Sequence, residues 1–112
     1  MKKIRSFALA CVLLCPVFAF SGTIENATIK RLEMSKSQEN WVLIDMDGSK
    51  SDCTVLASWD FALKTDTDYG KQMLSLLMSA YIAGKKVTLI GYSSPVCGYL
   101  GIEELDKIRT VK

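Results

Sequence analysis

Residues 54–86, TVLASWDFALKTDTDYGKQMLSLLMSAYIAGKK, decide the fold because they change from the period of a β-strand to that of an α-helix. In residues 54–63, apolar side chains occupy every second position, which is typical of a half-buried strand in an antiparallel sheet. Asp60 falls on the polar face of this predicted strand. The predicted apolar face holds Val55, Ala57, Trp59, Phe61 and Leu63.

Residues 65–84 carry apolar side chains every three or four positions, which predicts an amphipathic helix. Thr67 and its acidic neighbours suit the N-terminus of this helix, and Gly84 suits a left-handed cap at its C-terminus. The apolar stripe is broad, so we expect the helix to be buried on more than one side. Its main members are Tyr69, Met73, Leu76, Leu77, Ala80 and Tyr81.

Strand patterns lie on both sides of this stretch. Residues 23–34 are predicted to form one strand with a bulge, and residues 41–46 (WVLIDM) a second strand that ends in an Asp47-Gly48 hairpin turn. After the helix, residues 87–92 (VTLIGY) are predicted to be a strand. The segment 102–111 fits either a helical turn or a last strand.

The predicted order is three strands, one helix and two strands (β-β-β-α-β-β), a mainly β fold with one helix. This is the order of the OB-fold, a small Greek-key barrel with its helix between the third and fourth strands. A plain α+β sandwich has the same elements and is the alternative. A loop over residues 93–101 separates the last two predicted elements and carries Cys97.

The first residues have the pattern of an export signal. Three basic residues precede an uncharged apolar run, residues 7–20, that is too short to span a bilayer. Residues 1–19 are therefore predicted to be a signal peptide, with the cut after Ala19 or, alternatively, after Ser21. Residues 20–112 form one predicted OB-like domain, located in the periplasm or outside the cell.

Export changes both the charge and the cysteine count. Of 14 basic residues, removal of the three in the signal leaves eleven against 12 acidic ones, a net charge of −1. This charge argues against nucleic acid as a partner. Cys11 and Cys15 leave with the signal, and neither position suits a lipoprotein. Cys53 and Cys97 remain, and an even pair in an oxidising compartment predicts one disulfide.

The order of elements resembles the B subunits of pertussis- and subtilase-type bacterial toxins. The resemblance rests on a cysteine at the start of the third strand, the Gly-Lys-Lys end of the helix, the strand VTLIGY and a late cysteine. It implies a pentameric ring that binds cell-surface sugars. The chain is also similar to small uncharacterised exported proteins of Gram-negative bacteria, a similarity that implies no activity. The shared features are GTIENATIKRL, WDFAL, YGKQMLSLLMSAYIAGKKVTL and EELDKI.

Aromatic side chains supply the candidate ligand-binding residues, because their faces stack on sugar rings. Trp59 and Tyr81 lie in apolar patterns and are assigned to the core. Aromatic residues at strand ends or in the late loop are the better candidates for exposure, with partial burial in packing as the alternative. Together with two neighbouring serines, the candidates are Trp41, Tyr92, Ser93, Ser94 and Tyr99.

The sequence gives little support for metal binding or catalysis. A calcium loop of the EF-hand kind needs glycine at position six and glutamate at position twelve. Counted from Asp45, the glycine falls at position four and position twelve is Leu56. A solvated turn is therefore the simpler interpretation of these acidic residues. The chain has no histidine, no Gly-x-Ser-x-Gly motif and no phosphate-binding glycine loop. Glu103-Glu104 is interpreted as a solvated face. No catalytic residue, metal or cofactor is predicted.

The sequence therefore favours an exported, non-catalytic binding module for a glycan or an exported protein. The alternative is a monomeric periplasmic structural or inhibitor-like protein that binds another exported protein. Exposed charge on edge strands discourages pairing and weighs against an obligate ring. The basic residues on the late predicted strands are Lys85, Lys86, Lys107, Arg109 and Lys112.

Overall fold

The computed structural model describes residues 22–48, 53, 59–93 and 96–110. The predicted signal peptide, both of its cleavage bonds, the first half of the predicted strand 54–63, Asp52, Ser94 and Lys112 lie outside these residues. The elements are β1 (Thr23–Ala27), β2 (Ile29–Glu33), the 3-10 turn η2 (Lys36–Gln38), β3 (Trp41–Met46), β4 (Phe61–Lys64), α2 (Asp68–Ala83), β5 (Val87–Gly91) and β6 (Leu105–Thr110).

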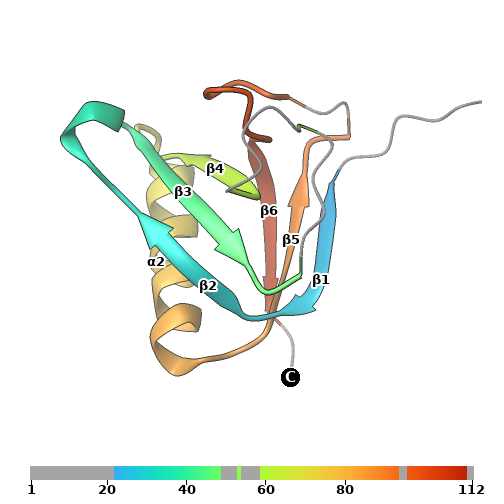
Figure 1. Ribbon diagram of the computed structural model, residues 1–112. Helices are drawn as coiled ribbons and strands as arrows, with labels where there is room; N and C mark the ends of the chain where they lie inside the picture. The colour runs from blue at the N-terminus through green and yellow to red at the C-terminus, as the bar shows by residue number, and fades with distance from the viewer. Residues whose placement is uncertain (1–21, 49–52, 54–58, 94–95, 111–112) are drawn as a thin grey trace, which may run out of the picture.

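The strands form two antiparallel sheets, ordered β1-β5-β6 and β2-β3-β4. The chain passes from one sheet to the other between β1 and β2, as Figure 1 shows. Thr28 is the residue between these two strands. On the other side, the sheets meet at a parallel bridge between Ala62 and Glu104. The result is an OB-like barrel that is not fully closed, and it confirms the predicted mainly β fold with one helix.

The prediction of a single strand over residues 23–34 was wrong, because this segment divides between the two sheets. Asn26 has a left-handed φ of 54°, which turns the chain just before the division. The Asp47 backbone N–H donates to the Thr28 carbonyl at 2.9 Å, and the Thr28 hydroxyl donates to the Asp47 carboxylate. These bonds tie the end of β3 to the point where the first segment changes sheets.

The predicted tight hairpin at Asp47-Gly48 was also wrong. Both edges of β3 are occupied, one by β2 and the other by β4, which begins only at Phe61. Residue 60 lies in a bend and not in a strand. The alternation of apolar and polar side chains that was predicted over residues 54–63 is therefore interrupted at this residue. Asp60 is buried, and its carboxylate accepts the Met46 N–H at 2.8 Å in place of a backbone partner.

The helix prediction was confirmed at both ends. The Thr67 hydroxyl accepts the Gly70 N–H at 2.9 Å, and Gly84 adopts a left-handed conformation with φ of 64°. The helix contacts β2 and β4 of one sheet and β6 of the other, so it packs against both sheets. The expectation of burial on more than one side was wrong, because α2 buries only the face that carries Gly70, Met73, Leu77 and Ala80.

The main core lies between the two sheets and the helix. Its fully enclosed members include Phe61, Leu77 and Leu89, one from each of β4, α2 and β5. A second, smaller apolar cluster of Leu43, Ala62 and Ile102 lies apart from it. Since Leu43 and Ala62 belong to β3 and β4, this cluster occupies the outer face of that sheet.

The late part of the chain bears on three expectations from the sequence. Residues 105–110 form a strand that pairs with β5, so the ambiguous segment is mostly β. Cys53 and Cys97 form the predicted disulfide, with a Cα–Cα distance of 5.7 Å. The interpretation of Glu103-Glu104 as a solvated face was wrong for Glu103, which is buried.

Candidate functional site

An aromatic stack covers the outer face of the β2-β3-β4 sheet. The ring centroids of Trp41 and Tyr99 are 4.9 Å apart at an interplanar angle of 23°. Alternation along β3 directs Trp41 and Leu43 away from the main core, while Tyr99 comes from the loop that carries Cys97. Both rings are half-buried on the smaller apolar cluster, so the loop is held down by packing as well as by the disulfide.

Trp59 packs on the same cluster, and a cation lies over its ring. The Arg31 guanidinium lies 4.4 Å from the centre of the Trp59 ring. The Arg31 Nε–H also donates to the Asp45 carboxylate at 2.9 Å. The cation covers one face of the Trp59 ring, just as Trp41 and Tyr99 each cover one face of the other. The prediction that Trp59 shares a face with Phe61 was wrong.

A cleft of about 130 Å³ lies where β4, the first turn of α2 and the start of β6 meet. Tyr69 and Tyr92 line it together with the carboxylates of Glu104 and Asp106. Burial raises the pKa of the Tyr92 phenol above its ordinary value of 10.0, and Glu104, Asp106 and Tyr69 raise it further. The Tyr92 hydroxyl therefore stays protonated at neutral pH and can both donate and accept a hydrogen bond.

Lys64 connects the cleft with the aromatic stack. It lines the cleft, and it is also the cross-strand partner of Trp41 in the β3–β4 pair. Residues directly opposite one another on an antiparallel pair have neighbouring side chains. The cleft and the stack are thus adjacent parts of one surface, which we call the aromatic surface: Trp41, Lys64, Tyr69, Tyr92, Tyr99, Glu104 and Asp106.

The structure brings together most of the residues that the sequence singled out. Trp41 and Tyr99 stack on each other, Tyr92 lines the adjoining cleft, and Ser93 is exposed next to Tyr92 along the chain. Ser94 lies outside the described residues. Four residues of this surface were not among the candidates named from the sequence: Lys64, Tyr69, Glu104 and Asp106. The two-residue spacing of Glu104 and Asp106 would place both on one face of a strand, but the segment was not assigned to a strand.

An apolar groove runs along the opposite flank of the helix. Its volume is about 360 Å³, and its walls come from β2, β3 and α2. Ile82 is 79% exposed and Met34 is 64% exposed, high values for two large apolar side chains that line one groove. The groove is lined by Leu32, Met34, Val42, Leu74, Met78, Tyr81 and Ile82.

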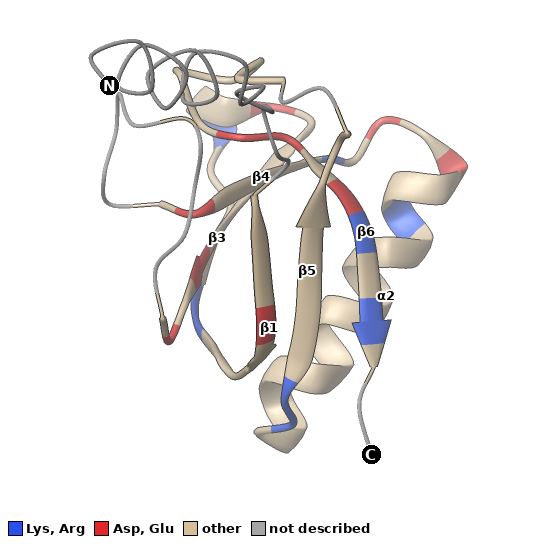
Figure 2. Cartoon of the chain, turned by 90° about the vertical axis from the view of Figure 1, so that its right-hand side faces the viewer, with Lys and Arg blue, Asp and Glu red and all other residues tan. Residues whose placement is uncertain are grey.

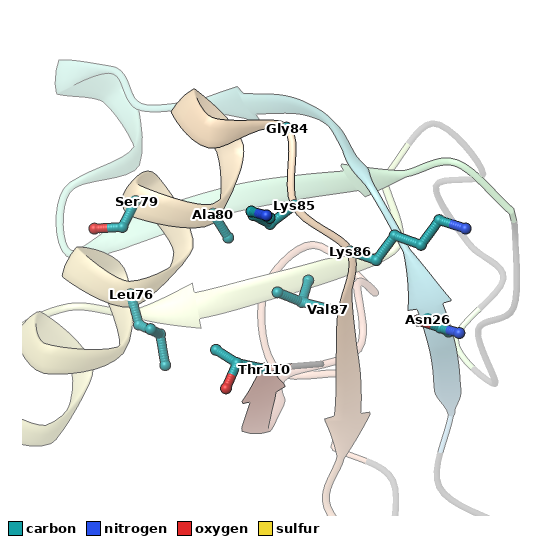
Figure 3. Close-up of a pocket in the computed structure, with 9 residues that line it drawn as sticks. All are labelled: Asn26, Leu76, Ser79, Ala80, Gly84, Lys85, Lys86, Val87 and Thr110. Carbon is teal, nitrogen blue, oxygen red and sulfur yellow. The ribbon is translucent and has the colours of Figure 1, made fainter. Parts of the chain in front are cut away.

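A larger groove of about 560 Å³ lies at the C-terminal end of α2 (Figure 3). Leu76, Ala80 and Val87 supply its apolar wall. Lys85 and Lys86 are at its rim, and the Lys86 side chain extends away from the helix, beyond β5. The groove therefore presents mostly apolar surface, with few polar groups converging on one point.

The acidic residues considered for calcium are engaged elsewhere. Asp45 pairs with Arg31, Asp47 accepts from Thr28, and Asp52 lies outside the described residues. Within the described ranges, no three His, Cys, Asp or Glu side chains are grouped as metal ligands. Nor does this part of the chain contain a helix that is long and apolar enough to cross a membrane. Comparison with protein-family models, curated proteins and solved structures found no match to this chain.

Proposed function

We propose that this protein is an exported, non-catalytic binding module that recognises a glycan at the aromatic surface. The observation that carries the proposal is the cleft in which Tyr69 and Tyr92 meet two carboxylates, beside the stacked Trp41 and Tyr99. Aromatic rings bind the C–H faces of a sugar, and carboxylates accept hydrogen bonds from its hydroxyls. The protonated Tyr92 phenol adds a donor at the same place.

The shape of the surface suits binding more than catalysis. Asp106 lies in β6 and Glu104 precedes this strand by one residue, and both line the cleft. Glycoside hydrolysis needs two carboxyl groups on opposite sides of the scissile bond, about 5–9.5 Å apart. Two carboxylates only two positions apart in the chain instead suit adjacent hydroxyls of a single sugar ring.

The resemblance to toxin B subunits implies a pentamer. The exposed charge on the edge strand β6 instead favours a monomer. Lys107 and Arg109 are exposed on β6, the edge strand of its sheet, and basic positions recur along this strand in Figure 2. Exposed cations on an edge oppose the pairing of that edge with another chain. A native mass of one chain would support a monomeric module, and a pentamer would support the ring.

Removal of the Tyr92 ring is expected to abolish most glycan binding. We expect Tyr92→Ala to weaken binding at least tenfold, which is about 1.4 kcal/mol. Glycan-array screening of the oxidised mature protein identifies the sugar, and titration calorimetry with it measures Kd. Tyr81→Ala is the matched control, because Tyr81 is 44% exposed against 38% for Tyr92 but lies in the apolar groove. Equal binding by Tyr92→Ala and wild type would contradict the proposal.

A second candidate function, binding of another exported protein, is favoured by the exposed apolar groove on α2. A groove lined by Met78, Tyr81 and Ile82 suits the apolar face of a partner helix. A photo-crosslinking residue at position 82 is expected to give one discrete adduct in exporting cells. The same residue at Gln72, which is exposed on α2 outside the groove, should give none. Identical patterns at both positions would exclude the groove as an interface.

A further inference from the structure

A β-bulge lies beside the cleft of the aromatic surface. The register of the β5–β6 pair shifts between Ile90 and Gly91, and Asp106 is the extra residue that the shift leaves on β6. Bulges of this kind change the direction of a side chain, and they are frequent next to binding sites. Asp106 and Glu104 both line the cleft, together with Tyr92, which follows β5 directly.

The charge around this cleft is negative. Within the described ranges, neither Glu104 nor Asp106 forms an ion pair with a lysine or an arginine. Lys64 also lines the cleft, but its ammonium lies 3.9 Å from the carboxylate of Asp66. Among these four side chains, three negative charges stand against one positive charge, which leaves a net charge of −2. A cation that enters the cleft is therefore attracted by it.

The Tyr92 phenol reports the same field. Burial raises the pKa of this phenol most, and Glu104 and Asp106 raise it further because they repel the negative phenolate. An ammonium group at the same place would be attracted by these two carboxylates. Tyr69 and Tyr92 also supply aromatic rings to the cleft, and the face of a tyrosine ring attracts a cation.

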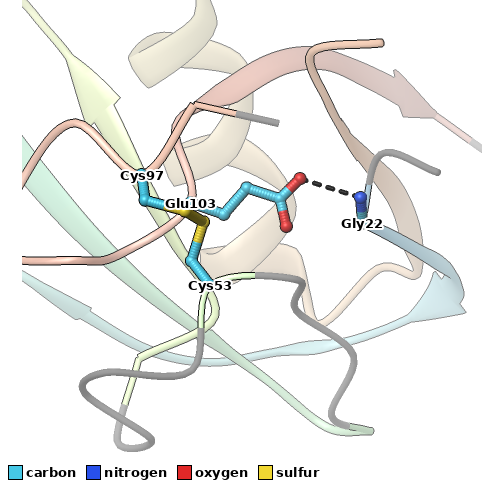
Figure 4. The surroundings of a disulfide bond; sticks show 4 residues. All are labelled: Gly22, Cys53, Cys97 and Glu103. Carbon is cyan, nitrogen blue, oxygen red and sulfur yellow. Dashed lines mark hydrogen bonds between the residues drawn. A yellow bond between two sulfur atoms is a disulfide. The ribbon is translucent and has the colours of Figure 1, made fainter. Parts of the chain in front are cut away.

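Glu104 lies on a firmly held part of the chain. Its backbone N–H donates to the Val96 carbonyl at 2.7 Å, next to the disulfide at Cys97. The preceding residue, Glu103, is buried, and its Oε2 accepts the N–H of Gly22 at 2.8 Å, as Figure 4 shows. A carboxylate on such a segment needs little ordering when a ligand binds, which favours affinity.

The size of the cleft suits one substituent of a sugar. Pockets that enclose complete small ligands measure about 300–1,000 Å³. This cleft measures about 130 Å³, and the stacked Trp41 and Tyr99 beside it offer a surface for the sugar ring. A protonated amine brings three donors and a full positive charge to the two carboxylates. A hydroxyl brings one donor and no charge, and so does the N–H of an acetylated amine.

We propose that the glycan recognised at the aromatic surface is an amino sugar with a free, protonated amine, which enters the cleft and pairs with Glu104 and Asp106. The proposal rests on the proposed glycan binding and adds the chemical class of the ligand. The sugar ring packs on the aromatic stack, and the amine lies against the rings of Tyr69 and Tyr92. A neutral or N-acetylated sugar leaves the charge of the cleft unpaired and binds more weakly.

Three tetrasaccharides with the same β-1,4-linked backbone test this specificity. They are built from glucosamine, N-acetylglucosamine and glucose, and they differ only in the amine, acetamide or hydroxyl group on each ring. Titration calorimetry with residues 20–112 at about pH 6 keeps both the amine and the carboxylates charged. We expect the glucosamine tetramer to bind at least about tenfold more tightly than the other two, because hydrogen bonds between charged groups are the stronger ones.

The possible results separate this proposal from glycan binding itself. Equal binding of all three tetramers, or tighter binding of the acetylated or neutral one, would overturn the amine and leave glycan binding in place. A glycan array in which the bound sugars lack a free amine would do the same. If no tetramer and no sugar of the array binds, glycan recognition at the aromatic surface fails, and the choice of an amino sugar fails with it.

Variants of single charges test the contacts. Asp106→Asn and Glu104→Gln should each weaken binding of the glucosamine tetramer about tenfold and leave that of the glucose tetramer nearly unchanged. Lys64→Gln removes the opposing cation and should tighten binding of the glucosamine tetramer. Glu25→Gln is the matched control, because it removes the same charge from an exposed position on β1 and should leave Kd unchanged.

The Tm of each variant is measured in parallel, and Asp106→Asn decides the outcome if Glu104→Gln does not fold. A merely structural role of the carboxylates would weaken binding of the glucosamine and glucose tetramers by the same factor. That result would overturn the proposal, as would unchanged binding of the glucosamine tetramer by folded Asp106→Asn.

Discussion

Loss of the Cys53–Cys97 disulfide is expected to lower the free energy of unfolding by about 4 kcal/mol. The bond closes a loop with a sequence separation of 44 residues, and the lost loop-closure entropy of the unfolded chain gives this magnitude. Net stabilities of domains lie at about 5–15 kcal/mol, so loss of the bond should remove about a quarter to four-fifths of the stability.

Urea unfolding of residues 20–112, the predicted domain, with and without reductant measures this effect. The double variant Cys53→Ser, Cys97→Ser should match the reduced wild type and be insensitive to reductant. We also expect the aromatic stack to loosen, because Tyr99 lies two residues from Cys97. A change of less than about 1 kcal/mol on reduction would mean that the loops are held by packing alone.

Phe61→Ala is expected to destabilise the domain by about 3–5 kcal/mol. Phe61 is 0% exposed, pairs with Ile44 across the β3–β4 ladder and belongs to the main core. Its removal loses the transfer free energy of the ring and leaves a cavity between sheet and helix. Since each kcal/mol corresponds to about 4–8 °C for a domain of this size, Tm should fall by more than about 12 °C.

Tyr81→Ala serves as the control for Phe61→Ala, because it also deletes an aromatic ring but from an exposed position on α2. Its cost should stay below about 1 kcal/mol. Thermal unfolding followed by circular dichroism compares the two variants. Similar destabilisation by both would mean that the core is not centred on Phe61.

The elements predicted best from the sequence are those whose signals are local. The ends of α2 were predicted because Thr67 caps a neighbouring N–H and Gly84 takes a left-handed conformation on its own. The strand at 41–46 was predicted to the residue from its β-rich composition. The errors at Thr28 and Asp60 have one cause. Each depends on which strand lies alongside, and that strand is remote in the sequence.

The candidate site was predicted only in part for the same reason. The aromatic character of Trp41, Tyr92 and Tyr99 is visible in the sequence, so these residues could be named. The contact of Trp41 with Tyr99 joins residues that are far apart in the chain, and it depends on the fold of the disulfide loop over the sheet. Tyr69 was assigned to the apolar stripe of the helix, although it is one of the stripe's most exposed members and lines the cleft.

The sequence by itself determined the order of the elements, the helix with its caps and the pairing of the last two cysteines. These follow from side-chain periodicity, capping chemistry and cysteine count, which act within a few residues or need no geometry. Only the tertiary structure decided that residues 23–34 divide between the two sheets and that Glu103 is buried against Gly22. Both depend on contacts between remote residues, whose free energy is gained only when the whole barrel assembles.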